Sequence, residues 1–412
     1  MQGDYRQSTR KTRQEAEKIN PVSMDLNDYF DPVSLERPRF HFVPEEHSFS
    51  RNISIHTPDR PIRDLDRHRL ALVGIPQDGN ALIKGSAEAP DRVRGMLYQL
   101  RMINDNIQVY DLGNLKITER VSDTYYALRD ITLELMERDI VPLFIGGSQD
   151  LSFGVFLALE KLTGTHQVLT VDPRFDFAVK PEQEIHSRNY LDYIMDPEKT
   201  GHFIPCHIGH QVYFVTGQQL DRIENEHQVA TRLGEIRHQL KMAEPIIRDS
   251  AFINMDINAV RHSDAPGTTI PSPNGFFGDE WCMLTRYAGL SHTLKALGIF
   301  ELKPSNDLNN QTSHLAAQAI WYFIDGFSRR IKEHPLETPE HTRKFIISMN
   351  ESEEKLIFHK STLSAKWWME LPAKNPATNH NFFISCSYED YQRACNQEIP
   401  DRWWKYLRRL AR

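Results

Sequence analysis

From residue 68 onward, short apolar runs alternate with stretches of helical periodicity, and this alternation limits the possible folds more than any other feature. The apolar runs span residues 70–76, 109–113, 140–147, 167–172, 203–209, 251–257 and 298–303. Helical periodicity fills most of the intervals, over residues 87–102, 123–137, 151–162, 217–222 with 230–242, 281–297 and 312–331. Such alternation predicts an α/β domain whose mostly parallel sheet is covered by helices on both faces.

Composition divides the chain into four parts. Residues 1–30 are expected to form a disordered or extended tail, and residues 31–333 the α/β domain. Residues 334–343 are rich in proline, threonine and charge and are expected to form a linker. Residues 344–412 predict a small α+β module with a hairpin, further strands and terminal helices. No catalytic or metal-ligand spacing occurs in that module, and its Trp367–Trp368 and Trp403–Trp404 pairs are interpreted as core packing.

Charge and hydropathy exclude several classes of protein. The formal net charge of -7 over 412 residues is mild, so neither nucleic acid nor an anionic membrane is expected as the main partner. No apolar run is long enough to span a bilayer, and the polar N-terminus lacks the apolar segment of a signal peptide. A cytoplasmic protein is therefore expected. The four cysteines are far apart and form no CxxC pair, so buried thiols are favoured over a zinc site or disulfides.

Polar residues follow several of the predicted strands directly. They lie in residues 146–150, 172–176 and 256–258, and at Glu301. In parallel sheets the chemistry lies just beyond the carboxyl ends of the strands, so these residues are the candidate site. In the segment VLTVDPRFDFA, Asp172 and Asp176 flank Arg174. Two carboxylates after a buried strand usually hold a metal ion or transfer protons, and an arginine between them is unexpected.

Five segments resemble the arginase–agmatinase–formimidoylglutamase family, also called the ureohydrolases. VGIPQDGNALIKGSAEAPDRVR is similar to the first βα segment of that family, and FIGGSQDLSFG to its GG-[DS]-H-[DS] loop. TVDPRFDFA takes the place of the D-A-H-x-D motif, and FINMDINAVRHSDAPGTT that of the S-x-D-x-D loop. FELKPSND resembles the late strand that carries a glutamate facing the substrate. The resemblance covers about residues 70–331, and the module after residue 344 lies outside it.

The resemblance implies two Mn²⁺ ions that activate a bridging water for attack on a guanidinium or amidine carbon, and an oligomer. Two close divalent ions need several carboxylates and neutral imidazoles around them. The ancestral metal-site positions in this chain are Gln149, Asp172, Arg174, Asp176, Asp256 and Asn258. Both histidines and one aspartate of the family motifs are thus replaced. Amide oxygens are poor substitutes for these ligands, and a guanidinium has no lone pair to donate.

The first hypothesis is that Arg174 replaces the dimanganese centre. Its guanidinium would pair with Asp172, Asp176 and Asp256, and no cofactor would be needed. The chain would then be an inactive member of the family, a pseudoenzyme that serves as a scaffold or binds a protein partner through its C-terminal module.

Two other functions stay open. The chain could be a metal-dependent hydrolase of formimidoylglutamate-, agmatine- or arginine-like substrates. Asp172, Asp176 and Asp256, with Asp150 beside them, would then hold Mn²⁺, and Asp176 and Glu301 would act in catalysis. Alternatively, the cleft could bind a small charged ligand without turnover.

Purely structural roles are also possible for these residues. Asp172 and Asp176 would be turn residues, and Gln149 would cap its loop. His186, His207 and His210, the remaining histidines of the region, would have structural roles. Without metals, Glu301 could instead pair with Arg174.

Overall fold

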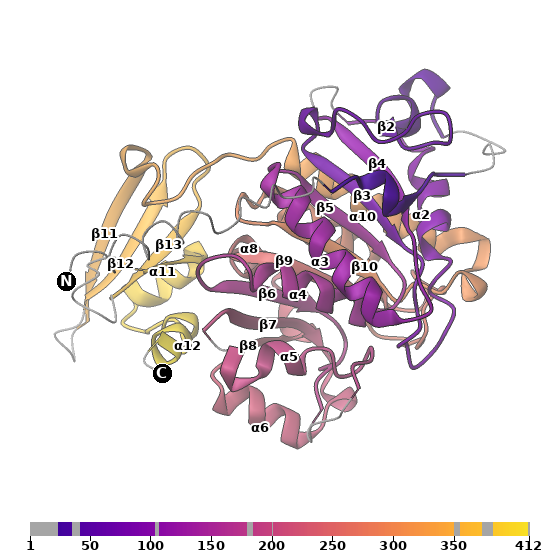
Figure 1. Cartoon of the computed structure of the whole chain (residues 1–412). Helices are drawn as coiled ribbons and strands as arrows, with labels where there is room; N and C mark the ends of the chain where they lie inside the picture. Colours follow the sequence, from indigo (N-terminus) through magenta and orange to yellow (C-terminus); the bar gives the residue numbers. More distant parts are fainter. Residues whose placement is uncertain are drawn as a thin grey trace, which may run out of the picture.

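The computed structural model describes residues 24–34, 42–103, 107–178, 184–199, 201–349, 355–372 and 382–410. Within these residues the main domain is built on one large sheet (Figure 1), in the order β1-β4-β3-β5-β10-β9-β6-β7-β8, with β2 also pairing with β4. All neighbouring strands are parallel except β1 and β4. The strands are β1 (Phe30–Asp31), β2 (Ser54–Ile55), β3 (Leu70–Ile75), β4 (Val109–Leu115), β5 (Val141–Gly146), β6 (His166–Val171), β7 (Phe203–His210), β8 (Val229–Arg232), β9 (Ser250–Asp256) and β10 (Ala296–Phe300).

Helices cover both faces of this sheet, because its central strands are apolar on both sides. One hydrophobic cluster joins one face to α2 (Ala89–Leu97), α7 (Leu233–His238), α8 (Ala243–Arg248), α9 (Gly278–Leu290) and α10 (Gln311–Phe327). A second cluster joins the other face to α3 (Val121–Glu137), α4 (Ser152–Leu159), α5 (Asp192–Met195) and α6 (Gly217–Asn225). The α/β class with a mostly parallel sheet, expected from the alternation of apolar runs, is confirmed.

Three boundaries differ from the sequence expectation. Residues 230–242 were expected to be helical, but Val229–Arg232 forms edge strand β8, because pairing with β7 outweighs the helical pattern. The helix expected over residues 281–297 ends at Leu290, since Ser291 is extended and β10 starts at Ala296. Residues 1–23 of the expected tail lie outside the described residues, whereas Phe30–Asp31, near its expected end, pairs with β4.

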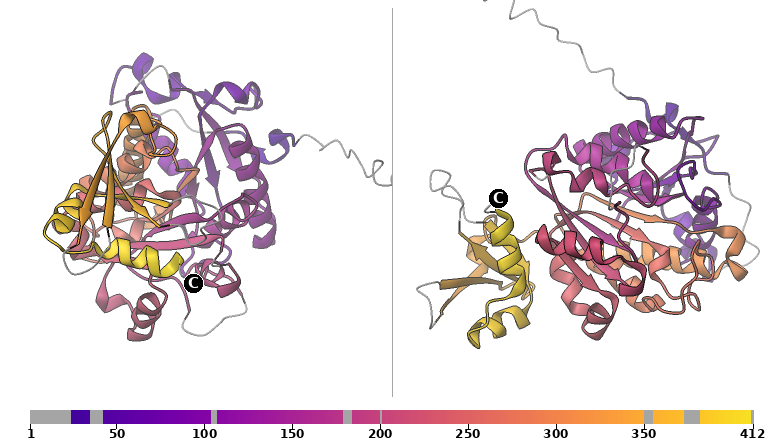
Figure 2. Two further views of the ribbon diagram at one scale, coloured as in Figure 1. Left: turned by 90° about the vertical axis from the view of Figure 1, so that its left-hand side faces the viewer. Right: turned by 90° about the horizontal axis from the view of Figure 1, so that it is seen from below.

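The C-terminal module is a separate antiparallel sheet with two helices, which stands beside the domain in Figure 2. Its strands are β11 (Thr342–Ser348), β12 (Lys355–Ser361), β13 (Trp367–Leu371) and β14 (Phe382–Cys386), and its helices α11 (Tyr388–Cys395) and α12 (Asp401–Leu410). Strand β11 begins inside the expected linker. The paired tryptophans serve mainly as core: Trp367, Trp368 and Trp403 are buried, and Trp404 is partly exposed.

The module packs on its own chain, at the amino ends of the sheet strands. Tyr406 of α12 donates a hydrogen bond to Gln167 at the start of β6, and Arg409 Nη2 donates to the carbonyl oxygen of Phe203, the first residue of β7, at 2.7 Å. The hydrophobic cluster of the domain also continues into the module. At roughly 3.3 Å per residue, a strand as long as β6 separates the module from the carboxyl ends of the strands by about 20 Å.

No helix in the described part of the chain combines the length and the apolar character needed to cross a bilayer. Cys206, Cys282 and Cys386 are buried free thiols, as expected from their spacing, whereas the free thiol of Cys395 is exposed and departs from that expectation.

Candidate functional site

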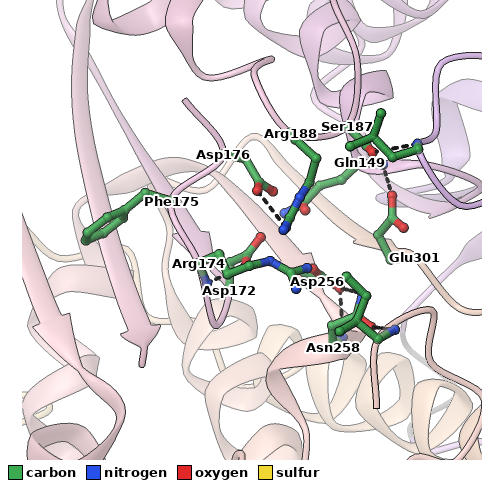
Figure 3. A network of polar contacts seen from close by, with 12 residues as sticks. Gln149, Asp172, Arg174, Phe175, Asp176, Ser187, Arg188, Asp256, Asn258 and Glu301 are labelled. Carbon is green, nitrogen blue, oxygen red and sulfur yellow. Dashed lines mark hydrogen bonds and ion pairs between the residues drawn. The ribbon is translucent and has the colours of Figure 1, made fainter. Parts of the chain in front are cut away.

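The candidate site lies at the carboxyl ends of four neighbouring strands. The sheet order β5-β10-β9-β6 brings together the residues that end or follow these strands: Gln149 after β5, Glu301 after β10, Asp256 at the end of β9 and Asp172 after β6. Figure 3 shows these side chains converging on a common centre. All four are at most 7% exposed, so the cluster is closed to bulk water. The parallel topology thus unites residues that are more than 150 positions apart in the sequence.

At the ends of β6 and β9, an aspartate side chain accepts a hydrogen bond from the turn that follows the strand. Asp172 Oδ1 accepts a hydrogen bond from the backbone N–H of Arg174 at 2.7 Å, and Asp256 Oδ1 accepts one from the N–H of Asn258 at 2.7 Å. Both are the side-chain turns that aspartate favours after a strand. Asp172 therefore serves as a turn residue, as expected, but only through its Oδ1 atom. The other oxygen faces the centre of the cluster.

Glu301 has a left-handed backbone, with φ of +65°. Such a conformation is uncommon outside glycine and costs about 1 kcal/mol or more. It is held by the Glu301 N–H, which donates to the carbonyl of Gly147 at 2.9 Å. In return, Oε1 of Glu301 accepts from the backbone N–H of Gln149 at 2.9 Å. The strained residue therefore ties the loop after β5 to the end of β10 and aims its carboxylate into the cluster.

Three side chains direct N–H donors at the carboxylates: the amides of Gln149 and Asn258, and the guanidinium of Arg188. The Gln149 amide is assigned with its nitrogen toward the carboxylates, because the opposite orientation would set oxygen against oxygen. It then donates to Asp172 Oδ2 at 3.0 Å and to Asp176 Oδ2 at 3.2 Å. Asn258 Nδ2 donates to Asp256 Oδ1 at 2.7 Å. The two amides, at positions that the resemblance assigns to metal ligands, thus act as donors toward carboxylates to which the resemblance assigns the same role.

The ion pair to the cluster comes from Arg188, which the sequence analysis did not identify. Arg188 Nη1 lies 3.0 Å from Asp176 Oδ1, and the side chains are 28% and 2% exposed. Arg188 lies on the segment between β6 and α5, outside every motif, and nothing in its sequence context indicates the role.

Arg174 is placed differently from the expectation of a guanidinium between Asp172 and Asp176. Its side chain is largely buried and runs toward Asp256 in Figure 3. Among the described residues it has no ion-pair partner within 4.0 Å, and its Nε has no hydrogen-bond partner. Its positive charge nevertheless acts on the cluster, since it opposes the rise in the pKa values of Asp176, Asp256 and Glu301.

Burial and crowding raise the pKa of three carboxyl groups. Loss of hydration, followed by repulsion from Asp172, raises the pKa of Asp176 well above its usual range. Loss of hydration, then repulsion from Asp172 and Glu301, does the same to the pKa of Asp256. Loss of hydration raises the pKa of Glu301 to about 7, and the N–H of Gln149 opposes that rise. The cluster therefore carries more carboxylate than its two arginines neutralise.

Other candidates lie beside the cluster, and three of them have hydrogen-bond partners of their own. Asp150 Oδ2 accepts a hydrogen bond from Tyr125 of α3 at 2.5 Å. The imidazole of His207 is buried and contacts the carbonyl of Asp172 at 2.9 Å, and His186 Nδ1 accepts from the N–H of Arg188 at 3.1 Å. Burial lowers the pKa of His210 to about 3. Within the described residues, no three His, Cys, Asp or Glu side chains are arranged to hold a metal ion.

The raised pKa of Glu301 predicts a pH-dependent effect of Glu301→Gln. Between its ordinary value of 4.5 and about 7, the folded state binds the proton more tightly than the unfolded state. The unfolding free energy of the wild type therefore loses this contribution as the pH rises through that window, whereas glutamine does not ionise. We expect the variant to be more stable than the wild type by up to about 3 kcal/mol at pH 8, and the difference to vanish near pH 4.5.

Urea unfolding at both pH values measures this difference, and Glu340→Gln, at an exposed position, is the matched control. A variant that is less stable than the wild type at pH 8 would contradict the assignment.

Comparison with known proteins places the domain in a family. The sequence profile of the Arginase family matches residues 68–325, which is more than half of the chain. The chain is 23% identical over 298 residues to the formimidoylglutamase of Rhodococcus jostii (strain RHA1), a match that covers 66% of this chain and 90% of the relative.

Solved structures agree on the fold. A Trypanosoma cruzi formiminoglutamase with Mn²⁺ superimposes with a TM-score of 0.60 at 19% identity, over 66% of this chain and 97% of that chain. The formimidoylglutamase of Bacillus subtilis gives a TM-score of 0.61 at 19% identity, over 72% and 97%. The matched region ends before the C-terminal module and includes the six positions that the resemblance assigns to metal ligands. The chain belongs to the arginase family.

Proposed function

We propose that this chain is a non-hydrolytic member of the arginase family, in which side chains rather than metal ions stabilise the carboxylate cluster. The observation that carries this proposal is the set of N–H donors around Asp172, Asp176 and Asp256. Gln149, Asn258 and Arg188 direct hydrogens at the oxygens that a metal ion would need. Arg174 adds a second positive charge from close by.

The chemistry of the donor set supports the same conclusion. A divalent ion binds lone pairs, and an oxygen that accepts a hydrogen bond from an amide or guanidinium has fewer to offer. Arginine remains protonated at every physiological pH, so it repels a cation at the position where the family motif has histidine. Two ions only a few Å apart need still more ligands, and the replacement of two histidines and one aspartate removes half of the six ancestral positions.

A non-hydrolytic role requires another task for the molecule, and we assign it to binding a protein partner. The C-terminal module supports this assignment, because it lies outside the family match and presents its own surface. It packs at the amino ends of the sheet strands, whereas the carboxylate cluster lies at their carboxyl ends. A partner bound to the module would therefore not compete with a ligand at the cluster. Self-association of the chain is part of the proposal and can be measured by light scattering.

Elemental analysis tests the proposal. The protein is expressed in Mn²⁺-supplemented medium, purified without chelator, and measured for Mn, Zn and Fe by mass spectrometry. We expect far less than one ion per chain and no change in Tm when Mn²⁺ is added. One or more tightly bound ions per chain would overturn the proposal.

The second candidate is a metal-dependent hydrolase of linear amidines or guanidines. Its support is the charge count of the cluster, in which Asp172, Asp176, Asp256 and Glu301 face only two arginines. That excess would attract one cation, with Asp172, Asp176 and Asp256 as its ligands and Asp176 and Glu301 as the residues that handle protons. Release of formamide from formimidoylglutamate, or of urea from agmatine or arginine, in the presence of Mn²⁺ would establish this function.

A further inference from the structure

A cavity of about 470 Å³ lies between the domain and the C-terminal module, away from the carboxylate cluster. The domain contributes residues at the amino ends of its strands, including Ile204 near the start of β7 and Thr293 just before β10. The module contributes Trp368 of β13 and Phe383 of β14. The volume falls in the range of sites for small organic molecules. Because the module lies outside the family match, this cavity is a feature added to the family fold.

The cavity has an aromatic wall on its module side. Trp368 is 2% exposed and shares a face of the module sheet with Phe383, and Phe382 also lines the cavity. Aliphatic side chains such as Ile204 and Leu371 complete the lining. Flat aromatic walls favour flat apolar ligands, since stacked and edge contacts add to the burial of apolar area.

Arg248 gives the cavity one buried cation with a free donor. This residue ends α8 and is only 2% exposed. Its Nη2 donates to the carbonyl oxygens of Trp367 at 3.0 Å and Cys386 at 3.3 Å, and its guanidinium lies 4.7 Å from the centre of the Trp368 ring. Its Nε lies 3.1 Å from Glu244 Oε1. Nε and Nη1, however, have no hydrogen-bond partner among the described residues, and Nη1 also lacks an ion-pair partner there; a buried unpaired donor is costly.

The other ionised group of the cavity is already satisfied. Asp249 Oδ2 accepts from the N–H of Ser385 at 2.9 Å and pairs with Arg402 Nη2 at 3.2 Å. The Nδ1 atom of His292, which also lines the cavity, has no partner among the described residues. The unpaired donor of Arg248 therefore favours a ligand with a negatively charged acceptor, placed next to the aromatic wall.

We propose that this cavity binds a small molecule with a flat apolar ring system and one carboxylate, whose oxygen accepts from Arg248 Nη1 while the ring packs on Trp368 and Phe383. Such a ligand touches both the domain and the module and so stabilises their association. The site is independent of the carboxylate cluster and does not depend on whether that cluster binds metal.

The test compares two probes of equal shape and different charge. Titration calorimetry of the full chain at pH 7.5 measures the binding of 1-naphthaleneacetate and of its neutral amide. We expect the acid to bind at least about tenfold more tightly, because only its carboxylate forms an ion pair with the guanidinium. Equal affinities, or no binding of either probe, would overturn the proposal.

Two variants separate the contribution of Arg248, on the domain side of the cavity, from that of Phe383, on the module side. Arg248→Gln should remove the preference for the acid, and Phe383→Ala should weaken both probes while the preference remains. Arg329→Gln, an exposed arginine outside the cavity, is the matched control and should bind like the wild type. Circular dichroism establishes that each variant is folded. If Arg248→Gln does not fold, the result with Phe383→Ala decides: unchanged binding of both probes would place the ligand elsewhere and overturn the proposal.

Discussion

Replacing Arg188 by glutamine is expected to lower the free energy of unfolding by about 2–3 kcal/mol at pH 8. Breaking a fully buried ion pair costs roughly 3–5 kcal/mol, and the 28% exposure of the Arg188 side chain reduces that figure. The loss arises because Asp176, itself 2% exposed, is left as an unpaired buried carboxylate beside Asp172. Urea unfolding followed by circular dichroism measures the difference from the wild type.

The pH dependence of this effect identifies its cause. Burial and Asp172 raise the pKa of Asp176, and Arg188 partly reverses that rise. Removing Arg188 raises the folded-state pKa further, so the stability difference between wild type and variant grows as the pH increases and shrinks as Asp176 takes up a proton. A difference that does not change with pH would show that Arg188 acts through packing alone.

Arg174→Gln is the matched comparison, since the two arginines lie on either side of Asp176 in the sequence and reach the same cluster. Arg174 makes no ion pair within 4.0 Å among the described residues, so we expect its replacement to cost less than half as much as that of Arg188. If Arg174→Gln is instead the more damaging variant, the original expectation that Arg174 is the principal cation of the cluster holds.

This contrast shows where sequence reasoning was sufficient and where it was not. Asp172, Asp256 and Glu301 were identified because each ends or follows a short apolar run, and parallel topology brings such positions to one edge. The same rule fails for Arg188, which reaches the cluster from a segment without regular pattern. Its role depends on the length and direction of a flexible side chain, and neither follows from periodicity.

Edge strand β8 was missed for a similar physical reason. Val229–Arg232 is too short to show a period, and its extended form depends on pairing with β7, which lies in a different part of the sequence. The cavity around Arg248 also required the structure, because it forms only when β13 and β14 pack against the amino ends of the domain strands. Local patterns therefore predicted elements and their order, whereas contacts between distant segments determined which polar groups meet.

Restoring the family ligands is expected to create an Mn²⁺ site that, under the proposed function, the wild type lacks. The triple variant Gln149→His, Arg174→His and Asn258→Asp replaces two donors and one cation by lone-pair ligands. At an Mn²⁺ concentration about 100-fold above Kd, binding to the folded state alone contributes roughly 2.7 kcal/mol. For a chain of this size that corresponds to a rise in Tm of about 3 °C, whereas the wild type should not respond. Scanning calorimetry with and without Mn²⁺ measures the shift.

The metal-free triple variant should in turn be less stable than the wild type, most strongly at high pH. It loses the charge of Arg174 and gains an aspartate in a cluster that already raises the pKa of Asp176 and Asp256. Adding Asp256→Asn to the triple variant removes one ligand and should abolish most of the response to Mn²⁺. If the wild type and the triple variant respond equally to Mn²⁺, the donors around the carboxylates do not exclude metal, and the hydrolase becomes the better account of this site. If only the triple variant responds, three side chains separate a metal centre from an internal network of charges and amides.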